Sequence, residues 1–401
     1  MILATDIESG NGKNIREIAK DHFQMELDGD TPGYADYFHV KLIEDQSRNT
    51  MVTLDLLPDS KFADFYSEHG GYDVAFAHVG EAVNTPDLII IDRTFFDPKG
   101  SPIWCKRRGD WVRHPPDLHS PLNGSMRVLV PMEGGEEVNL CSNVPLLYSQ
   151  NVKWMEEAFQ SNRAISRLEI LGQSVQGRNI YCFEITDPSH VKKKGNIVFL
   201  SGSHGIEFPG QWATRGILEY LLSPDPFAKW VREKYVVHII IHSNPDGTVM
   251  GRPQVNVEGI NIHSDIEMKS REANVLWKHL STCEPIIYME FHGWRCCERG
   301  HEPFEGSYGV SVLEHKTDIG RLTKTILDKE LVRKTFAISR YECIVESEFF
   351  PGYNLTKEFD TVSYVYEPNM RVGVEGCKAR GVQVLKVLLN GIEIVKTKTM
   401  K

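Results

Sequence analysis

The sequence lacks any long apolar run. No stretch of its 401 residues reaches the roughly 18 consecutive apolar residues that a membrane-spanning helix requires. The first 15 residues also lack the apolar core of a signal peptide, and they carry acidic residues at Asp6 and Glu8. We therefore expect no membrane span, no membrane partner and a cytoplasmic location.

Positive charge is also in short supply. Lys and Arg number 45 against 55 Asp and Glu, which gives a formal net charge of −10. A nucleic-acid partner needs a concentrated basic surface, so we expect none. The eight cysteines are scattered without the spacing of a small disulfide scaffold, which favours free thiols in a reducing compartment.

The first part of the sequence contains a succession of short apolar runs separated by turn residues. Within residues 1–150 these runs are TMVTLDLL (50–57), VAFAHV (74–79), DLIIIDRTFF (87–96) and SMRVLVPM (125–132). Gly, Pro, Asn and Asp separate them, and no long segment has the helical period of 3.6 residues. This pattern predicts an N-terminal all-β sandwich domain over residues 1–150.

From residue 151 the pattern changes to alternating strands and helices. Predicted strands are 196–203, 235–243, 285–292 and 361–367, after two strand-like runs around a turn within 166–186. Predicted helices are 151–160, 210–222, 273–280, 318–331 and 377–392. The alternation predicts an open, mostly parallel but mixed sheet covered by helices on both faces, over residues 151–401. The fold class is α/β, with a β-sandwich followed by this second domain.

Four side chains suited to metal hydrolysis lie where predicted strands end. His204 and Glu207 follow the strand at 196–203, His292 ends the strand at 285–292, and Glu367 ends the strand at 361–367. Ligands of open α/β sheets bind at the carboxyl ends of strands, so these side chains are expected to meet. Two histidines and a glutamate form the ligand set of a catalytic zinc with one position left for water.

Each residue taken alone has a simpler interpretation. His-x-x-Glu is common, His292 alone could be a core histidine, and Glu367 alone could be a solvated acid. Their joint position at strand ends favours one zinc ion per chain, held by His204, Glu207 and His292. Glu367 then serves as the general base that takes a proton from water and passes it to the leaving amine.

These motifs resemble the zinc carboxypeptidases of the M14 metallopeptidase family. His204-x-x-Glu207, His292 in FHG, NPDG at 244–247 and Glu367 each match a family motif. The segments ESGNGKNI, YFHV, NVPLLYSQ and LGQSVQGRNI further resemble the cytosolic carboxypeptidase branch, which carries an N-terminal β-sandwich. The resemblance implies a zinc carboxypeptidase-type catalytic domain over 151–401.

The sequence departs from the family where substrate is held. The family's Asn-Arg pair, which grips the terminal carboxylate, is replaced by His263 and Ser264, and Asn261 replaces an aspartate. Serine cannot form a bidentate salt bridge as arginine does, so the carboxylate grip is in question. Arg252 matches the family's earlier arginine, which polarises the scissile carbonyl.

Other residues are weaker candidates for holding substrate. His263 is either a fourth group at the metal site, a substrate donor or a local hydrogen-bonding residue. Arg295 is either a replacement for the missing clamp or a surface arginine, and Tyr353, in the loop before the last strand, is a candidate substrate-binding tyrosine. Adjacent Cys296 and Cys297 lack zinc-site spacing.

Three functions remain open from the sequence. The first is a zinc metallocarboxypeptidase that removes a C-terminal residue from a peptide. The second is a deacylase or amidase acting on a small or modified amino-acid substrate, which the missing Asn-Arg pair favours. The third is a zinc-binding recognition protein without catalysis, which the retention of the whole ligand set and Glu367 disfavours.

Overall fold

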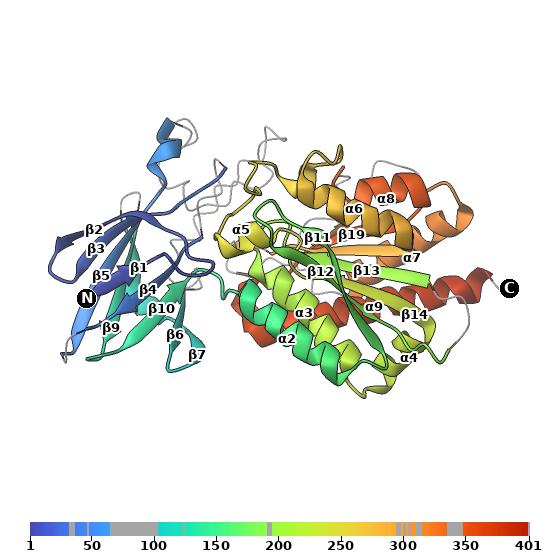
Figure 1. Cartoon of the computed structure of the whole chain (residues 1–401), viewed down its shortest axis with the longest axis horizontal. Helices are drawn as coiled ribbons and strands as arrows, with labels where there is room; N and C mark the ends of the chain where they lie inside the picture. Colours follow the sequence, from blue (N-terminus) through green and yellow to red (C-terminus); the bar gives the residue numbers. More distant parts are fainter. Residues whose placement is uncertain are drawn as a thin grey trace. The chain divides into compact units, whose positions relative to one another are not determined.

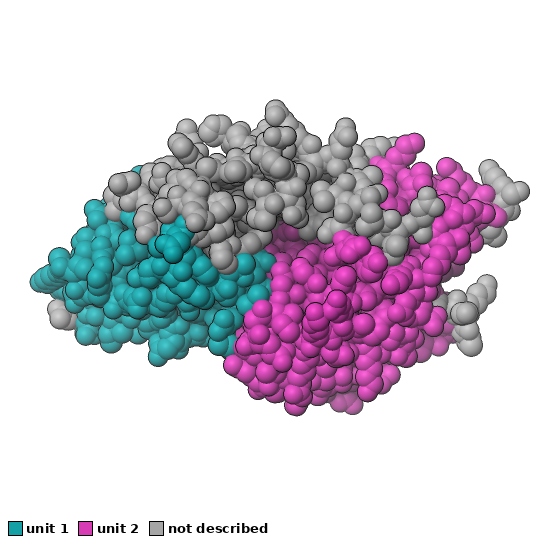
Figure 2. Space-filling view, turned by 90° about the horizontal axis from the view of Figure 1, so that it is seen from above, with its two compact units in different colours: residues 1–145, 249–255, 295–303 teal, residues 146–248, 256–294, 304–401 magenta. Residues whose placement is uncertain are grey.

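A computed structural model describes the fold over residues 1–31, 37–45, 48–64, 103–122, 125–190, 195–293, 298–299, 302–303, 306–309, 315–334 and 348–399. The chain forms two compact units (Figures 1 and 2). Residues 1–145, 249–255 and 295–303 make up the first unit, and residues 146–248, 256–294 and 304–401 make up the second. The predicted ranges 1–150 and 151–401 are continuous, whereas these units are not. As separate folding domains, the two ranges remain a proposal.

The first unit contains two five-stranded sheets. One has the order β1-β4-β10-β6-β7, with β1 Ile2–Ala4, β4 His39–Ile43, β10 Glu137–Cys141, β6 Trp104–Arg107 and β7 Asp110–Arg113. The other has the order β2-β3-β5-β9-β8, with β2 Lys13–Ala19, β3 His22–Glu26, β5 Thr50–Leu57, β9 Ser125–Met132 and β8 His119–Leu122. A short pair, β16 Glu298–Arg299 and β17 Glu302–Pro303, also belongs to this unit.

Both sheets contribute to one core, which makes the pair a sandwich. Alternate residues of β9 point inward, and Val128 and Val130 share a buried cluster with Leu54 from β5 and Val40 and Leu140 from the other sheet. The period of two along these strands is what buries one face of each sheet. The predicted β-sandwich is therefore confirmed. Of the four predicted runs, 50–57 and 125–132 are strands, and 74–79 and 87–96 lie outside the described residues.

The segment 249–255 is held by residues near the N-terminus. Asn11 donates from its side chain to the carbonyl of Gly251, at 3.0 Å. Asp30 accepts hydrogen bonds from the backbone N–H groups of Gln254 and Val255, each at 3.0 Å in its shorter contact. These bonds explain why this stretch groups with the first unit although the chain on either side of it belongs to the second.

The second unit is built on a seven-stranded mixed sheet of order β11-β12-β14-β13-β15-β19-β18. Its strands are β11 Ser166–Gln173, β12 Asn179–Ile185, β14 Tyr235–Ile240, β13 Gly195–Ser201, β15 Ile287–Phe291, β19 Val362–Glu367 and β18 Gly306–Gly309. Strands β14, β13, β15 and β19 are parallel, and β11, β12 and β18 are antiparallel to their neighbours. The predicted open mixed sheet is confirmed.

Helices cover both faces of this sheet (Figure 1). They are α2 Tyr148–Ser161, α3 Phe208–Leu222, α4 Pro226–Lys234, α5 Pro245–Val249, α6 Arg271–Cys283, α7 Asp318–Lys334, α8 Gly352–Phe359 and α9 Gly373–Thr399. Figure 1 shows α6 and α8 on one side and α2, α3 and α9 on the other. All five predicted helices are present, and α4, α5 and α8 are additional. None of the helices described is long and apolar enough to cross a bilayer.

Glycines allow α3 to pack very closely against its neighbours. A Cβ on Gly381 of α9 would lie 2.1 Å from the carbonyl oxygen of Ala213 in α3. A Cβ on Gly210, in the first turn of α3, would lie 1.9 Å from the carbonyl oxygen of His292. No real side chain fits at such distances, so α3 is locked against both α9 and the end of β15.

Candidate active site

The turn that carries His204 is supported by the NPDG segment. A Cβ on Gly205 would lie 2.2 Å from the carbonyl carbon of Gly247, so two backbones meet here without side chains between them. The side-chain oxygen of Asn244 accepts from the N–H of Gly247 at 2.9 Å, and its amide donates to the carbonyl of Ser203 at 3.3 Å. The motif thus holds the backbone that presents His204.

The third residue of NPDG fixes a second turn. Asp246 is buried and accepts hydrogen bonds from the Ser174 hydroxyl at 2.8 Å, the Gln176 N–H at 2.8 Å and the Arg178 guanidinium at 2.7 Å. These residues form the hairpin between β11 and β12, so the LGQSVQGRNI and NPDG segments are two parts of one structural unit.

His204, Glu207 and His292 come together at the carboxyl ends of β13 and β15. The donor atoms that they offer all lie within 4.8 Å of one another. Glu207 places one carboxylate oxygen 2.9 Å from Nδ1 of His204 and the other 2.6 Å from Nδ1 of His292. All three side chains are buried, and Glu207 occupies the position immediately before the first turn of α3.

The far nitrogen of each histidine faces an oxygen. Nε2 of His204 lies 3.1 Å from the side-chain oxygen of Asn261, and Nε2 of His292 lies 3.0 Å from Oε1 of Glu290. Nδ1 of each histidine lies at hydrogen-bond distance from Glu207, and it is the nitrogen that a metal ion would bind if the proton is on Nε2. Outer contacts of this kind orient metal-binding histidines, and Asn261 supplies one without the charge of the aspartate it replaces.

Charge is concentrated at this cluster. Burial raises the pKa of Glu207, but the neighbouring His204 and His292 outweigh it and hold the pKa well below the usual value. Burial lowers the pKa of His292, but Glu207 and Glu290 outweigh it and raise the pKa well above the usual value. Two imidazole nitrogens and a carboxylate, gathered in a buried site, fit the donor set of a catalytic zinc ion.

Glu290 is the residue that sequence reasoning missed. It is fully buried on β15 and accepts hydrogen bonds from the hydroxyls of Ser203 at 2.6 Å and Tyr288 at 3.0 Å. Burial raises its pKa, but His292 and His263 outweigh this and hold the pKa below the usual value. The signal was the Glu-x-His spacing within MEFH, because residues two apart on a strand share a face.

His263 belongs to the same polar network. Its Nδ1 lies 3.4 Å from Oε2 of Glu290, and its ring stacks on Phe349 at 4.7 Å between centroids and 18° between planes. Burial first, and then His292, lower the pKa of His263 to about 4, against the opposing effect of Glu290. The neutral ring therefore contacts its neighbours inside the protein, while Ser264 beside it is exposed.

Glu367 ends β19 at the same edge of the sheet. Phe291 and Tyr366 are paired in register, and the N–H of His292 donates to the carbonyl of Tyr366 at 3.0 Å. Glu367 follows Tyr366 as His292 follows Phe291, so both residues lie at the carboxyl ends of adjacent parallel strands. Glu367 is partly exposed.

A family model described as zinc carboxypeptidase, peptidase M14, matches residues 151–276, the stretch that includes His204, Glu207 and NPDG. Residues 151–276 are thus similar to the M14 zinc carboxypeptidase family. The resemblance recognised from the motifs is confirmed over this stretch.

A known protein with a similar sequence matches only part of this chain. Cytosolic carboxypeptidase 2 of Danio rerio is 28% identical over 173 residues, which cover 40% of this chain and 24% of that protein. The chain thus matches about a quarter of this relative's length.

Solved structures match over nearly the whole chain. A metallo-carboxypeptidase from Burkholderia cenocepacia has a TM-score of 0.75 at 14% identity and covers 98% of this chain and 99% of its own. A metallo-carboxypeptidase from Pseudomonas aeruginosa, solved with (2-guanidinoethylmercapto)succinic acid, has a TM-score of 0.74 at 17% identity, with 98% and 100% covered. At these identities the likeness shows the fold.

The remaining predicted residues belong to other segments of the chain. Arg252 lies in the segment 249–255 of the first unit, and Arg295 falls outside the described residues, as do Cys296 and Cys297. Tyr353 was expected in a loop but lies in the first turn of α8. That helix forms because Leu355 and Phe359, four residues apart, pack one face into the core under α6. The substrate roles of these residues remain predictions.

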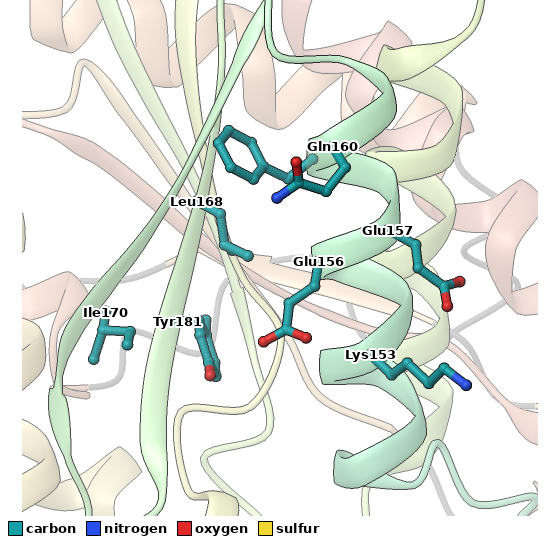
Figure 3. A pocket seen from close by; sticks show the side chains of 8 residues that line it. Lys153, Glu156, Glu157, Gln160, Leu168, Ile170 and Tyr181 are labelled. Carbon is teal, nitrogen blue, oxygen red and sulfur yellow. The ribbon is translucent and has the colours of Figure 1, made fainter.

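An open hollow elsewhere in the second unit is not part of this site. It has a volume of about 590 Å³ and lies between α2 and the strands β11 and β12 (Figure 3). Glu156 of α2 faces Leu168, Ile170 and Tyr181 across it. Its lining contains no histidine or cysteine, and nothing in it resembles the donor set described above.

Proposed function

We propose that the protein is a zinc-dependent hydrolase of amide bonds, and that it acts as a metallocarboxypeptidase on a peptide substrate. The observation that supports this most is the buried cluster of His204, Glu207 and His292, with Glu367 at the end of the adjacent strand. The proposed ligands of one catalytic zinc are those three side chains. When bound, zinc supplies Lewis-acid activation of water and of the scissile carbonyl near neutral pH.

The protein's side chains perform the other catalytic tasks. Glu207 and the two histidines hold the site, and Asn261 and Glu290 fix the orientation of the histidine rings through their Nε2 atoms. Glu367 accepts the proton of the attacking water and then donates it to the departing amine. Arg252 is proposed to stabilise negative charge on the carbonyl oxygen.

Two versions of this proposal differ in how the substrate is bound. A carboxypeptidase must bind a free terminal carboxylate, which Ser264 cannot do by charge, so Arg295 or Arg252 would have to serve. A deacylase or amidase needs no such cation, and the engagement of His263 with Glu290 and Phe349 favours this second candidate. The relatives named cytosolic carboxypeptidases support the carboxypeptidase version of the proposal. We also propose a cytoplasmic location from the same names.

A comparison of paired substrates tests the proposal. We expect the zinc-loaded protein to hydrolyse peptides that end in a free carboxylate and to leave the matching C-terminal amides intact. Faster hydrolysis of the amide or of an N-acyl amino acid would reject the carboxypeptidase function and favour the deacylase or amidase. Glu367→Gln, prepared in parallel, excludes a contaminating peptidase, and no hydrolysis of any amide by the wild type would refute the enzymatic proposal.

A further inference from the structure

A second group of metal-binding side chains lies in the second unit, away from the proposed active site. Cys182 of β12, His238 of β14 and His279 of α6 each offer a donor atom, and these atoms lie within 4.8 Å of one another. Sγ of Cys182 is 3.9 Å from Nδ1 of His238. The two imidazole rings meet edge to face, with centroids 5.1 Å apart and planes at 69°.

Strand register explains how these residues meet. His238 pairs with Glu184 on β12, so Cys182, two residues before Glu184, lies on the same face of the sheet as His238. Helix α6 covers this face, because its Leu276 and Leu280 share a buried cluster with Cys182. The His279 side chain therefore comes from α6, whereas the side chains of Cys182 and His238 project from the sheet.

The position on the strands separates this group from the first site. His238 pairs with Val198 of β13, six residues before His204 along the same direction of chain. Strand β13 continues from Val198 to Ser201, which is about 10 Å at about 3.3 Å per residue, and His204 lies in the turn beyond it. The second group also contains a thiol, which the set of His204, Glu207 and His292 lacks.

The polar atoms of this group are buried and incompletely satisfied. Cys182 is 1% exposed and His238 is 4% exposed. Nε2 of His279 is buried and has no hydrogen-bond partner among the residues that the structure describes. Burial of such an atom without a partner is unfavourable, and a bound cation would provide the missing interaction.

The histidine on β14 is oriented as metal-binding histidines are. Nε2 of His238 lies 3.3 Å from the side-chain oxygen of Asn196, which leaves Nδ1 directed at Cys182. His204 has the same arrangement, with Asn261 behind its Nε2. A proton on Nε2 of His238, facing Asn196, would leave the lone pair of Nδ1 available to a cation.

We propose that Cys182, His238 and His279 form a second metal site that binds zinc or a closely related divalent cation. One thiolate and two imidazoles are donors that suit zinc. A tetrahedral zinc ion would place sulfur and nitrogen ligands about 3.6 Å apart, from its usual bond lengths, so the 3.9 Å separation needs little adjustment.

Binding is a proton exchange without redox chemistry. The Cys182 thiol loses its proton to water, the thiolate forms the bond to the cation, and the two neutral imidazoles add their lone pairs. The carboxylate of Glu184, 4.0 Å from Nδ1 of His238, adds negative charge beside the cation. The bound ion joins α6 to β12 and β14, which makes the site structural and independent of the proposed hydrolysis.

Cobalt substitution tests this site directly, because only a thiolate ligand gives a sulfur-to-cobalt charge-transfer absorption in the near ultraviolet. We expect that absorption in the cobalt-loaded wild type and, with equal intensity, in His292→Ala, which removes a ligand of the first site. We expect it to disappear in Cys182→Ser and to fall severalfold in His279→Gln. Zinc content should fall from two ions per chain to one in Cys182→Ser.

A matched control and a second variant keep the test decisive. The double variant Cys296→Ser, Cys297→Ser removes other thiols and should keep the absorption. His279 is partly exposed on α6, so His279→Gln tests the site even if Cys182→Ser does not fold. The proposal would be overturned if the wild type bound cobalt without this absorption, or if Cys182→Ser or His279→Gln kept it unchanged. Loss of the absorption in the control would also overturn it. None of these outcomes depends on hydrolytic activity.

Discussion

Glu290→Gln is the substitution that best tests how the proposed catalytic zinc is held. Glutamine keeps the size of the side chain, and its single side-chain oxygen can still accept a hydrogen bond from Ser203. It loses the negative charge 3.0 Å from Nε2 of His292, and it presents an amide NH₂ where a carboxylate oxygen accepts from Tyr288. The ring of His292 should therefore become a weaker and less well oriented donor.

The expected magnitude follows from this loss. Removal of an outer partner of a metal-binding histidine weakens metal binding by about 10- to 100-fold. That range corresponds to about 1.4–2.7 kcal/mol of binding free energy. At saturating zinc, the stabilisation of the folded protein by the ion should fall by a similar amount, because ligand binding and folding are linked.

The measurement is a zinc competition titration against a chelator of known affinity, combined with thermal unfolding with and without zinc. A Cys182→Ser background restricts the readout to the site of His204, Glu207 and His292. Glu272→Gln is the matched control, since Glu272 is also fully buried and accepts from Asn256 at 2.7 Å, but contacts no histidine. We expect the control to leave zinc affinity unchanged. Equal zinc affinity in Glu290→Gln and the parent, or equal weakening in both variants, would refute the reasoning.

Four further predictions concern other parts of the chain. His292→Ala should lose the zinc of the first site, as measured by elemental analysis, and full retention there would reject the ligand assignment. Glu367→Gln should keep its zinc while turnover falls by about 10²–10⁴-fold, and near-normal turnover would mean that another group activates water. Gly210→Ala should lower the melting temperature and weaken zinc binding, because its Cβ would lie 1.9 Å from the carbonyl oxygen of His292. Asp55→Asn should lower the free energy of unfolding near pH 7 by about 1–3 kcal/mol. Burial raises the pKa of Asp55, but Arg127 and then His22 outweigh it and lower the pKa, so this contribution is present above the carboxyl's unfolded pKa. It is lost as the pH falls through the folded pKa, and pH-dependent denaturation of both proteins should show the difference shrinking in acid.

The sequence was sufficient for the parts of the site that depend on strand ends. Buried strands are recognisable as apolar runs, and parallel strands bring their carboxyl ends to one edge, so His204, Glu207 and His292 could be grouped before any coordinates were known. Glu290 was missed because only residues beyond the strand ends were considered, whereas it lies within β15 and acts through its neighbour.

Contacts between distant elements could not be predicted in this way. Cys182, His238 and His279 meet because of the register of β12 against β14 and the placement of α6, and no short motif encodes either. The short helix α8 was read as loop because its apolar face spans only two turns. The grouping of 249–255 with the first unit depends on hydrogen bonds to Asn11 and Asp30, more than 200 residues earlier in the chain.

The interleaving of the two units limits how this protein can be cut or recombined. A fragment that begins at residue 146 would still contain 249–255 and 295–303 but would lack the residues with which those segments group. The carbonyl of Gly251 would lose Asn11, and the N–H groups of Gln254 and Val255 would lose Asp30. Such a fragment should expose these backbone groups to proteases, and transplanting the N-terminal sandwich of a relative would require changing both internal segments with it. The sandwich therefore depends on segments from later in the chain and is not an exchangeable module.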